Sequence, residues 1–128
     1  MTKTLTRTIA LLGALSSFSL VAFEAQAVEL RVKCETRSDR SRGSVDGKNL
    51  SSGNYFAMFK SGANSATSPL EHTVGDEVEF DFDSNRRDIR QGATPIAKNF
   101  IVNGQATGEL YNEAGNLVAS KTVNCRRN

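Results

Sequence analysis

The chain has no tryptophan, only two prolines and a single histidine among its 128 residues. Without tryptophan, it cannot form the antibody-type core in which a tryptophan packs against the disulfide. With His72 as the only imidazole, a copper site or another centre built from several histidines is not expected. We interpret His72, next to Glu71, as a surface or loop residue, and a role as general base or metal ligand is the less favoured alternative.

Only one long apolar run is present, at residues 9–23, and it is too short for a confident membrane span of about 20 residues. Lys3 and Arg7 precede the run, and Ala25-Gln26-Ala27 follows it as a small-x-small cleavage site. This pattern predicts that residues 1–27 are a cleaved signal peptide and that residues 28–128 form one exported domain. We therefore expect a periplasmic or extracellular protein without a transmembrane segment in its mature chain.

Cysteine is also scarce, with Cys34 and Cys125 lying 91 positions apart. There is no Cys-x-x-Cys motif, so a metal-binding pair or a reactive thiol is less favoured than a disulfide between the two. Closing so long a loop would stabilise the fold by up to about 4–5 kcal/mol. We expect a structural disulfide, Cys34–Cys125.

The mature chain has almost no net charge. Removal of Lys3, Arg7 and Glu24 with the signal peptide leaves 14 basic (16 − 2) and 13 acidic (14 − 1) residues. The charges are nevertheless segregated along the sequence. Basic residues crowd the start, at Arg31, Lys33, Arg37, Arg40, Arg42 and Lys48, and acidic residues crowd the middle, at Glu71, Asp76, Glu77, Glu79, Asp81 and Asp83. This pattern indicates either two solvated strand faces or a pair of complementary patches within or between molecules.

Apolar and polar residues alternate with the period of β-strands in several short segments. The clearest are residues 28–34, with Cys34 on the inner face, and residues 78–83, with Val78, Phe80 and Phe82 inward and acids outward. Further strands are expected at residues 55–59 (an inner strand covered on both faces), 100–102, 106–111 and 117–125. In the last strand, Leu117, Ala119, Lys121, Val123 and Cys125 should share one face, which Lys121 interrupts.

Turn signals separate these segments. Asp46-Gly47 predicts a tight hairpin between short arms at residues 44–45 and 49–50, and residues 61–69 predict a loop. One helical turn is expected over residues 85–91, capped by Ser84 and stopped by Gly92. The whole pattern predicts an all-β fold, a single antiparallel sandwich of seven or eight strands of immunoglobulin-like or jelly-roll-like type.

The strongest candidate ligand set is Asp81, Asp83, Asn85 and Asp88, four oxygen-bearing side chains within eight residues. Calcium prefers such ligands, and the spacing matches the start of an EF-hand loop. The match then fails, because Arg86 occupies the position that requires glycine and Gly92 the position that requires glutamate. A calcium site is therefore the alternative to a solvated acidic strand face followed by turn residues.

Other chemistry is less well supported. Glu79 and Asp81 could form a glycosidase pair, but a flat strand face offers no pocket to raise one pKa. The basic stretch at residues 37–42 could bind an anionic surface such as a lipopolysaccharide or polysaccharide. Nucleic acid is not expected, because no aromatic residue lies between Phe23 and Tyr55 to stack on bases.

These observations favour an exported, non-enzymatic binding or accessory module that presents a sheet face or a loop end to a protein or envelope glycan. Neither a catalytic residue nor a cofactor is expected. The alternatives are a calcium-binding protein that uses residues 81–88 and, less favoured, a small secreted hydrolase.

Overall fold

Strands make up most of the computed structural model, which describes residues 27–128. The expected signal peptide, residues 1–27, lies outside this described part except for Ala27. The strands are β1 (Glu29–Arg37), β2 (Arg40–Lys48), β3 (Asn54–Ser61), β4 (Asn64–Thr67), β5 (Glu71–His72), β6 (Val78–Asp83), β7 (Thr94–Pro95), β8 (Gln105–Asn112), β9 (Leu117–Asn124) and β10 (Arg126–Arg127). The all-β prediction is confirmed. Within residues 27–128 the strands number ten rather than seven or eight, because β5, β7 and β10 are two-residue pairings that the alternation could not indicate.

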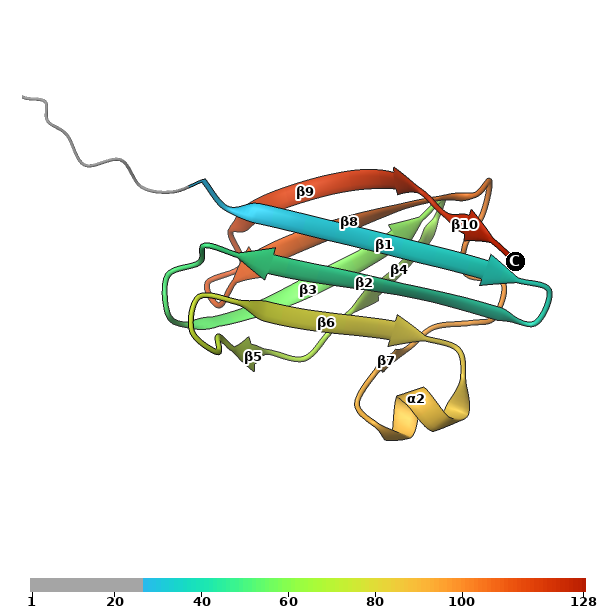
Figure 1. Cartoon of the computed structure of the whole chain (residues 1–128), viewed down its shortest axis with the longest axis horizontal. Helices are drawn as coiled ribbons and strands as arrows, with labels where there is room; N and C mark the ends of the chain where they lie inside the picture. The colour runs from blue at the N-terminus through green and yellow to red at the C-terminus, as the bar shows by residue number, and fades with distance from the viewer. Residues whose placement is uncertain (1–26) are drawn as a thin grey trace, which may run out of the picture.

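Two sheets face each other, with strand orders β10-β1-β2-β6-β7 and β4-β3-β8-β9, and β5 pairs with β3. In Figure 1, β1, β2 and β6 lie side by side in front of β3 and β8. The core between the sheets includes Phe59, Phe82 and Leu110, each almost completely buried. Phe59 stacks on Phe82 at 5.3 Å and on Phe100 at 5.6 Å between ring centroids. Within residues 27–128, no helix is long and apolar enough to cross a membrane.

The inward and outward residues of β6 are as the alternation predicts. Val78, Phe80 and Phe82 are buried, and Glu79 and Asp81 are exposed on the opposite face. Burial of such side chains contributes about 1.5–3 kcal/mol each, which explains why the period of two is kept so strictly here.

The hairpin predicted at Asp46-Gly47 is wrong, because both residues lie within β2. Asp46 pairs with Arg31 of β1 on one side and with Glu79 of β6 on the other. A Cβ atom at Gly47 would come within 2.8 Å of the Leu110 side chain, so this glycine serves close packing between the sheets. The sequence suggested that Gly47 forms a turn, whereas in the structure it lies within a strand where there is no room for a side chain.

Two further boundaries differ from the sequence prediction. Residues 64–67, expected in a loop, form the edge strand β4, which pairs with β3 from Met58 to Ser61. Residues 100–102 were expected to form a strand, but only Val102 makes an isolated bridge, to Gln105. The intervening Asn103-Gly104 turn has positive φ at both residues (55° and 65°), a backbone conformation that asparagine and glycine tolerate.

Lys121 is explained by the position of β9 at the edge of its sheet. It pairs with Gly108, whose neighbours in β8, Ala106 and Leu110, are buried, so Lys121 lies on the inner side. An inward-pointing charge on an edge strand opposes pairing with another chain. Leu117 does not share this side, because a bulge opposite Leu110 and Tyr111 shifts the register.

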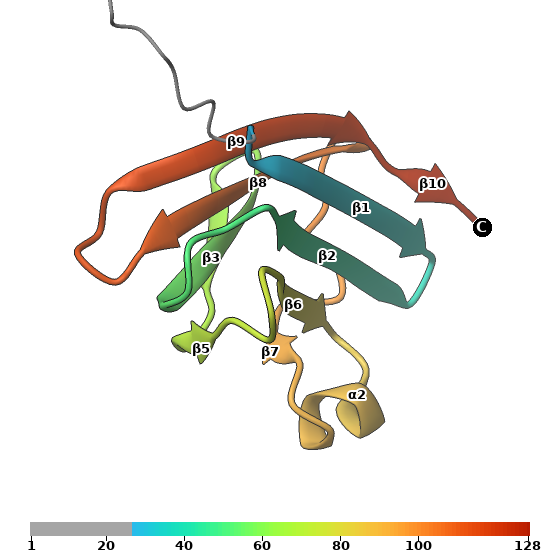
Figure 2. The ribbon, with the colours of Figure 1, turned by 60° about the vertical axis from the view of Figure 1, so that its left-hand side comes forward.

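The predicted disulfide, Cys34–Cys125, is confirmed, with 4.6 Å between the two Cα atoms. Figure 2 shows the chain passing from β9 into β10, beside the end of β1. There β10 pairs in parallel with β1, with Arg126 opposite Glu35. The disulfide thus ties β1 of one sheet to the residue that follows β9, the edge strand of the other sheet.

The predicted helical turn is present as α2 (Arg86–Arg90). Its cap is Asn85 rather than Ser84, and the Asn85 side chain accepts hydrogen bonds from the amides of Arg87 and Asp88. Ser84 instead accepts a hydrogen bond from the Ser41 amide of β2. The cap is one residue later than predicted because Ser84 joins α2 to the sheet.

Candidate functional site

The outward side of the sheet β4-β3-β8-β9 is nearly free of charge. We call the outward side chains of β3, β8 and β9 the neutral face: they are Asn54, Phe56, Met58, Lys60, Gln105, Thr107, Glu109, Tyr111, Leu117, Ser120, Thr122 and Asn124. The only two charged side chains in this set, Lys60 and Glu109, form an ion pair with each other at 2.9 Å. The face therefore presents hydroxyl, amide, aromatic and aliphatic groups without net charge.

An aromatic pair lies across β3 and β8 on the neutral face. Phe56 and Tyr111 stand in register and stack with ring centroids 5.0 Å apart and planes 9° from parallel. Phe56 and Met58 are partly exposed, so the prediction that β3 is covered on both faces is wrong. The segment reads as continuously apolar because the small core residue Ala57 lies between two large outward side chains.

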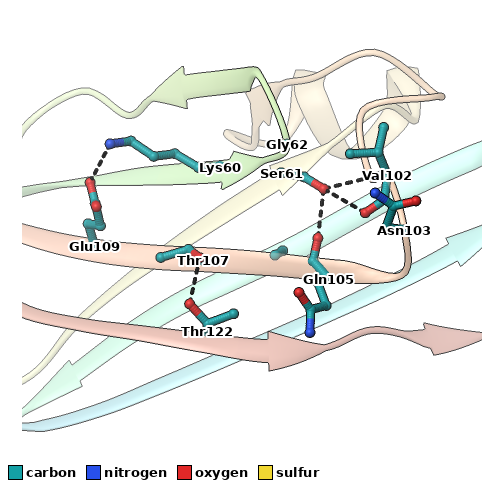
Figure 3. Close-up of a pocket in the computed structure, with 10 residues that line it drawn as sticks. Lys60, Ser61, Gly62, Val102, Asn103, Gln105, Thr107, Glu109 and Thr122 are labelled. Carbon is teal, nitrogen blue, oxygen red and sulfur yellow. Dashed lines mark hydrogen bonds and ion pairs between the residues drawn. The ribbon is translucent and has the colours of Figure 1, made fainter.

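A shallow depression of about 340 Å³ lies at the other end of this face (Figure 3). Its floor includes Thr107 and Thr122, whose hydroxyls are 2.7 Å apart, and its rim includes Asn103 and Gln105. The buried hydroxyl of Ser61 holds this rim, since it contacts the Gln105 carbonyl at 2.6 Å and accepts from the Val102 amide at 2.8 Å.

Glu109 links the aromatic pair to the depression. Burial would raise the pKa of Glu109, but the hydrogen bond from the Tyr111 hydroxyl (2.7 Å) and the contact with Lys60 outweigh burial and lower it. The hydrogen bond to Glu109 in turn raises the pKa of Tyr111, so its hydroxyl stays protonated at neutral pH. The arrangement fixes a carboxylate acceptor, an ammonium donor and a phenol edge on one surface.

The outward side of β1, β2 and β6 is very different. We call it the charged face, and its side chains are Glu29, Arg31, Lys33, Glu35, Arg37, Arg40, Arg42, Ser44, Asp46, Lys48, Glu79, Asp81 and Asp83. The pairing places Arg31 and Lys33 of β1 and Glu79 and Asp81 of β6 on either side of β2. The segregated charges of the sequence therefore lie on one face of one sheet.

The candidate cation ligands lie at the end of this face, where an arginine already occupies their centre. Arg40 donates to both Asp83 oxygens, at 3.0 and 2.6 Å, and to Asp88 at 2.9 Å. Burial would raise the pKa of Asp83, but the hydrogen bonds from Arg40 and the Asn85 amide outweigh it, and the pKa is lowered. Sequence reasoning did not link Arg40 to this segment, because 43 residues separate it from Asp83.

Neither of the other two candidate ligands, Asn85 and Asp81, joins Asp83 and Asp88 around a common point. The Asn85 side-chain oxygen caps α2, and Asp81 is exposed one row along β6. Within residues 27–128, no group of three or more His, Cys, Asp and Glu side chains is placed to hold a metal ion. The structure therefore brings Asp83 and Asp88 together around a guanidinium, and the calcium hypothesis gains no support from this geometry.

The remaining candidate residues are exposed. The His72 imidazole is 2.9 Å from the Asn54 side-chain oxygen, an amide without acid–base function.

Asp46 of β2 pairs with Glu79 and was not identified from the sequence as a candidate site residue. Burial, and then the negative charges of Glu79 and Asp81, raise the pKa of Asp46 to about 6.

Phe56 and Tyr111 were also missed as site residues. The only sequence signal for Tyr111 is its place in an alternating strand, opposite in phase to the buried Leu110. Its stacking on Phe56 depends on a pairing between residues 55 positions apart (111 − 56), which sequence periodicity does not specify.

Comparison with known proteins identifies no relative: no protein-family model, no curated protein and no solved structure matches the chain.

Proposed function

We propose that the protein is an exported, non-enzymatic binding module whose neutral face takes a neutral, hydroxyl-rich glycan of the cell envelope. The observation that carries this proposal is the combination of a stacked aromatic pair, Phe56 and Tyr111, with hydroxyl and amide groups around a shallow depression. Because Lys60 and Glu109 form an ion pair with each other, the neutral face has no net charge with which to attract an ionic partner.

The chemistry of the face matches that of a sugar. The C–H faces of a pyranose ring are apolar and pack on aromatic side chains, as other apolar groups do. Its hydroxyls require both donors and acceptors, which Asn103, Gln105, Glu109 and Thr122 supply around the depression. An open, shallow site of this kind holds a few sugar units of a long polymer rather than enclosing a small molecule.

A catalytic function on the neutral face is not proposed. Glycoside hydrolysis requires two carboxyl groups, one of which has a raised pKa. Glu109 is the one carboxylate among the residues lining the depression, and its pKa is lowered. The property that favours the hydrolase alternative lies on the charged face, where the pKa of Asp46 is raised to about 6 beside Glu79.

Isothermal titration of the mature chain with a panel of neutral oligosaccharides and polysaccharides tests the proposal. We expect saturable binding to at least one neutral glycan, weakened tenfold or more in Tyr111→Ser and in Phe56→Ser. Lys33→Gln, on the charged face, is the matched control and should bind like the unmodified chain. Binding that is equal in all three variants, or absent across the panel, would contradict the proposal.

The same samples address the alternatives. Release of reducing sugar, lost in Asp46→Asn, would instead support the hydrolase hypothesis. Capture of a protein partner that requires Phe56 and Tyr111, with no glycan binding, would mean that the neutral face is a protein interface, for which aromatic and methionine side chains are also suited.

We also propose that the fold is an immunoglobulin-like sandwich and that the protein is exported. The order β1-β2-β6 opposite β4-β3-β8-β9 supports an immunoglobulin-like sandwich, because it corresponds to strands A-B-E opposite C′-C-F-G. The disulfide joins β1 to the residue between β9 and β10, in place of the B–F bridge of antibody domains. Export is supported by this disulfide and by the signal-like pattern of residues 1–27.

A further inference from the structure

Three arginines converge on one buried carboxylate at the end of the charged face, opposite the side used in the proposed function. Glu35 of β1 is 8% exposed. Around it lie the guanidinium groups of Arg37 from β1, Arg42 from β2 and Arg126 from β10. We call these three arginines the arginine triad.

The triad surrounds Glu35 without forming close hydrogen bonds to it. The Glu35 oxygens lie 3.5 Å from Arg37 Nη2, 3.8 Å from Arg42 Nη1 and 4.0 Å from Arg126 Nη2. Among the residues that the structure describes, the buried Oε2 atom of Glu35 has no hydrogen-bond partner. The N–H groups of the triad are therefore not engaged in close hydrogen bonds with the Glu35 carboxylate at their centre.

Arg40, on the same face, is an arginine whose N–H donors are engaged by carboxylates. It makes three hydrogen bonds of 2.6–3.0 Å to Asp83 and Asp88 and is largely covered. The triad side chains are 46%, 49% and 76% exposed, so their donors face solvent. Asp83 and Asp88 are thus paired with Arg40, and the three arginines of the triad keep a net positive charge after Glu35 is counted.

The three arginines of the triad lie on three adjacent strands, β1, β2 and β10, whose pairing fixes their positions. Glu35 is in register with Arg42 and with Arg126, and the disulfide joins the residues that immediately precede Glu35 and Arg126. The Glu35 carboxylate offsets the mutual repulsion of three guanidinium groups. In Figure 2, β10 lies beside the end of β1, where this covalent tie places it.

We propose that the arginine triad is a binding site for a phosphate group. Guanidinium groups present planar pairs of N–H donors that match phosphate oxygens, and three of them approaching from different strands can engage three oxygens of one tetrahedral group. Lys33, one row along β1, adds positive charge on the same side. The site is separate from the neutral face, so the two proposals stand or fall independently.

Titration of the ¹⁵N-labelled mature chain with sodium pyrophosphate at constant ionic strength tests the site. We expect saturable chemical-shift changes centred on residues 35–37, 42 and 126. Arg42→Gln and Arg126→Gln should each weaken binding about tenfold, the effect of losing one hydrogen bond to a charged group. Arg31→Gln removes the same charge from the same face of β1, outside the triad, and should change the affinity less than twofold.

Thermal melts of each variant, with and without pyrophosphate, separate binding from folding. A purely structural triad would lower the melting temperature on substitution and show no pyrophosphate-dependent rise in the unmodified chain, which would overturn the proposal. Equal weakening in Arg31→Gln and Arg42→Gln would also overturn it, since only overall charge would then matter.

Two sources of the phosphate group are distinguished by a second arm of the experiment. Co-sedimentation with phosphatidylcholine vesicles, with and without phosphatidic acid, reports on a lipid headgroup. Binding to pyrophosphate and to the phosphatidic acid vesicles supports the site and assigns it to a membrane surface. Binding to pyrophosphate alone supports the site and assigns it to a soluble phosphate compound.

Discussion

The two outer faces of this molecule are built from the same kind of strand but use charge in opposite ways. On the neutral face, one lysine and one glutamate pair with each other, and aromatic and hydroxyl groups occupy the rest. On the charged face, acidic and basic side chains occupy nearly every outward position, and how each is paired decides its energetic role. Composition alone therefore does not identify a binding surface: the chain is almost neutral overall, yet one face is ionic and the other is not.

The largest expected effect concerns the covalent tie between the two sheets. The double variant Cys34→Ser/Cys125→Ser should lower the free energy of unfolding by about 2–5 kcal/mol, because a long loop is no longer closed in the unfolded chain. Urea denaturation measures this change, and Ellman's reagent should detect no free thiol in the denatured, unreduced protein. Two titratable thiols in freshly exported protein would contradict the pairing.

The ion pairs of the two faces should differ in strength. Arg40→Ala leaves the buried Asp83 carboxylate without its guanidinium and should lower the free energy of unfolding by about 3 kcal/mol. Lys60→Ala breaks the more exposed pair with Glu109 and should have a distinctly smaller effect in the same urea series. Equal effects would remove the energetic distinction between the faces.

A pH-dependent effect is expected from Asp46 on the charged face. Its pKa is raised to about 6 in the folded protein, above an unfolded value of about 4, so its contribution to stability is present below pH 4 and is lost as the pH rises through 6. Asp46→Asn should therefore stabilise the protein by about 1–2 kcal/mol at pH 7.5, after a reduction for solvent screening, and by almost nothing at pH 4. Asp39→Asn, in the exposed β1–β2 turn, is the control for a lost negative charge. Stabilisation that is independent of pH would rule out this explanation.

The aromatic pair of the neutral face should contribute a smaller amount. A double-mutant cycle with Phe56→Ala and Tyr111→Ala should give a coupling energy of about 1 kcal/mol, typical of a stacked pair beyond its buried area. A coupling near zero would mean that the rings stand side by side without stabilising each other and are free to take a ligand between them.

The smallest effect is expected from calcium. Because Arg40 already lies between Asp83 and Asp88 and offsets part of their negative charge, millimolar calcium should not raise the melting temperature more than magnesium at the same ionic strength. A saturable, calcium-selective rise that is lost in Asp88→Asn would restore the calcium-binding hypothesis for residues 81–88.

Features that depend on periodicity and on residue type could be predicted from the sequence: the all-β class, the inward faces of β1 and β6, the helical turn at α2 and the disulfide. Each rests on a local rule, since alternation within one strand distinguishes its two faces. The only two cysteines leave a single intramolecular pairing.

Which segments lie next to each other could not be read from the sequence and depends on the packing of the whole domain. Gly47 looked like a turn residue until its contact with Leu110 of the other sheet was known, and Arg40 had no visible connection to Asp83. The stacking of Phe56 on Tyr111, the arginines around Glu35 and the raised pKa of Asp46 all require strand order and register. These are set by the packing of both sheets together, because a pairing between distant segments is stabilised only when the whole core forms around it.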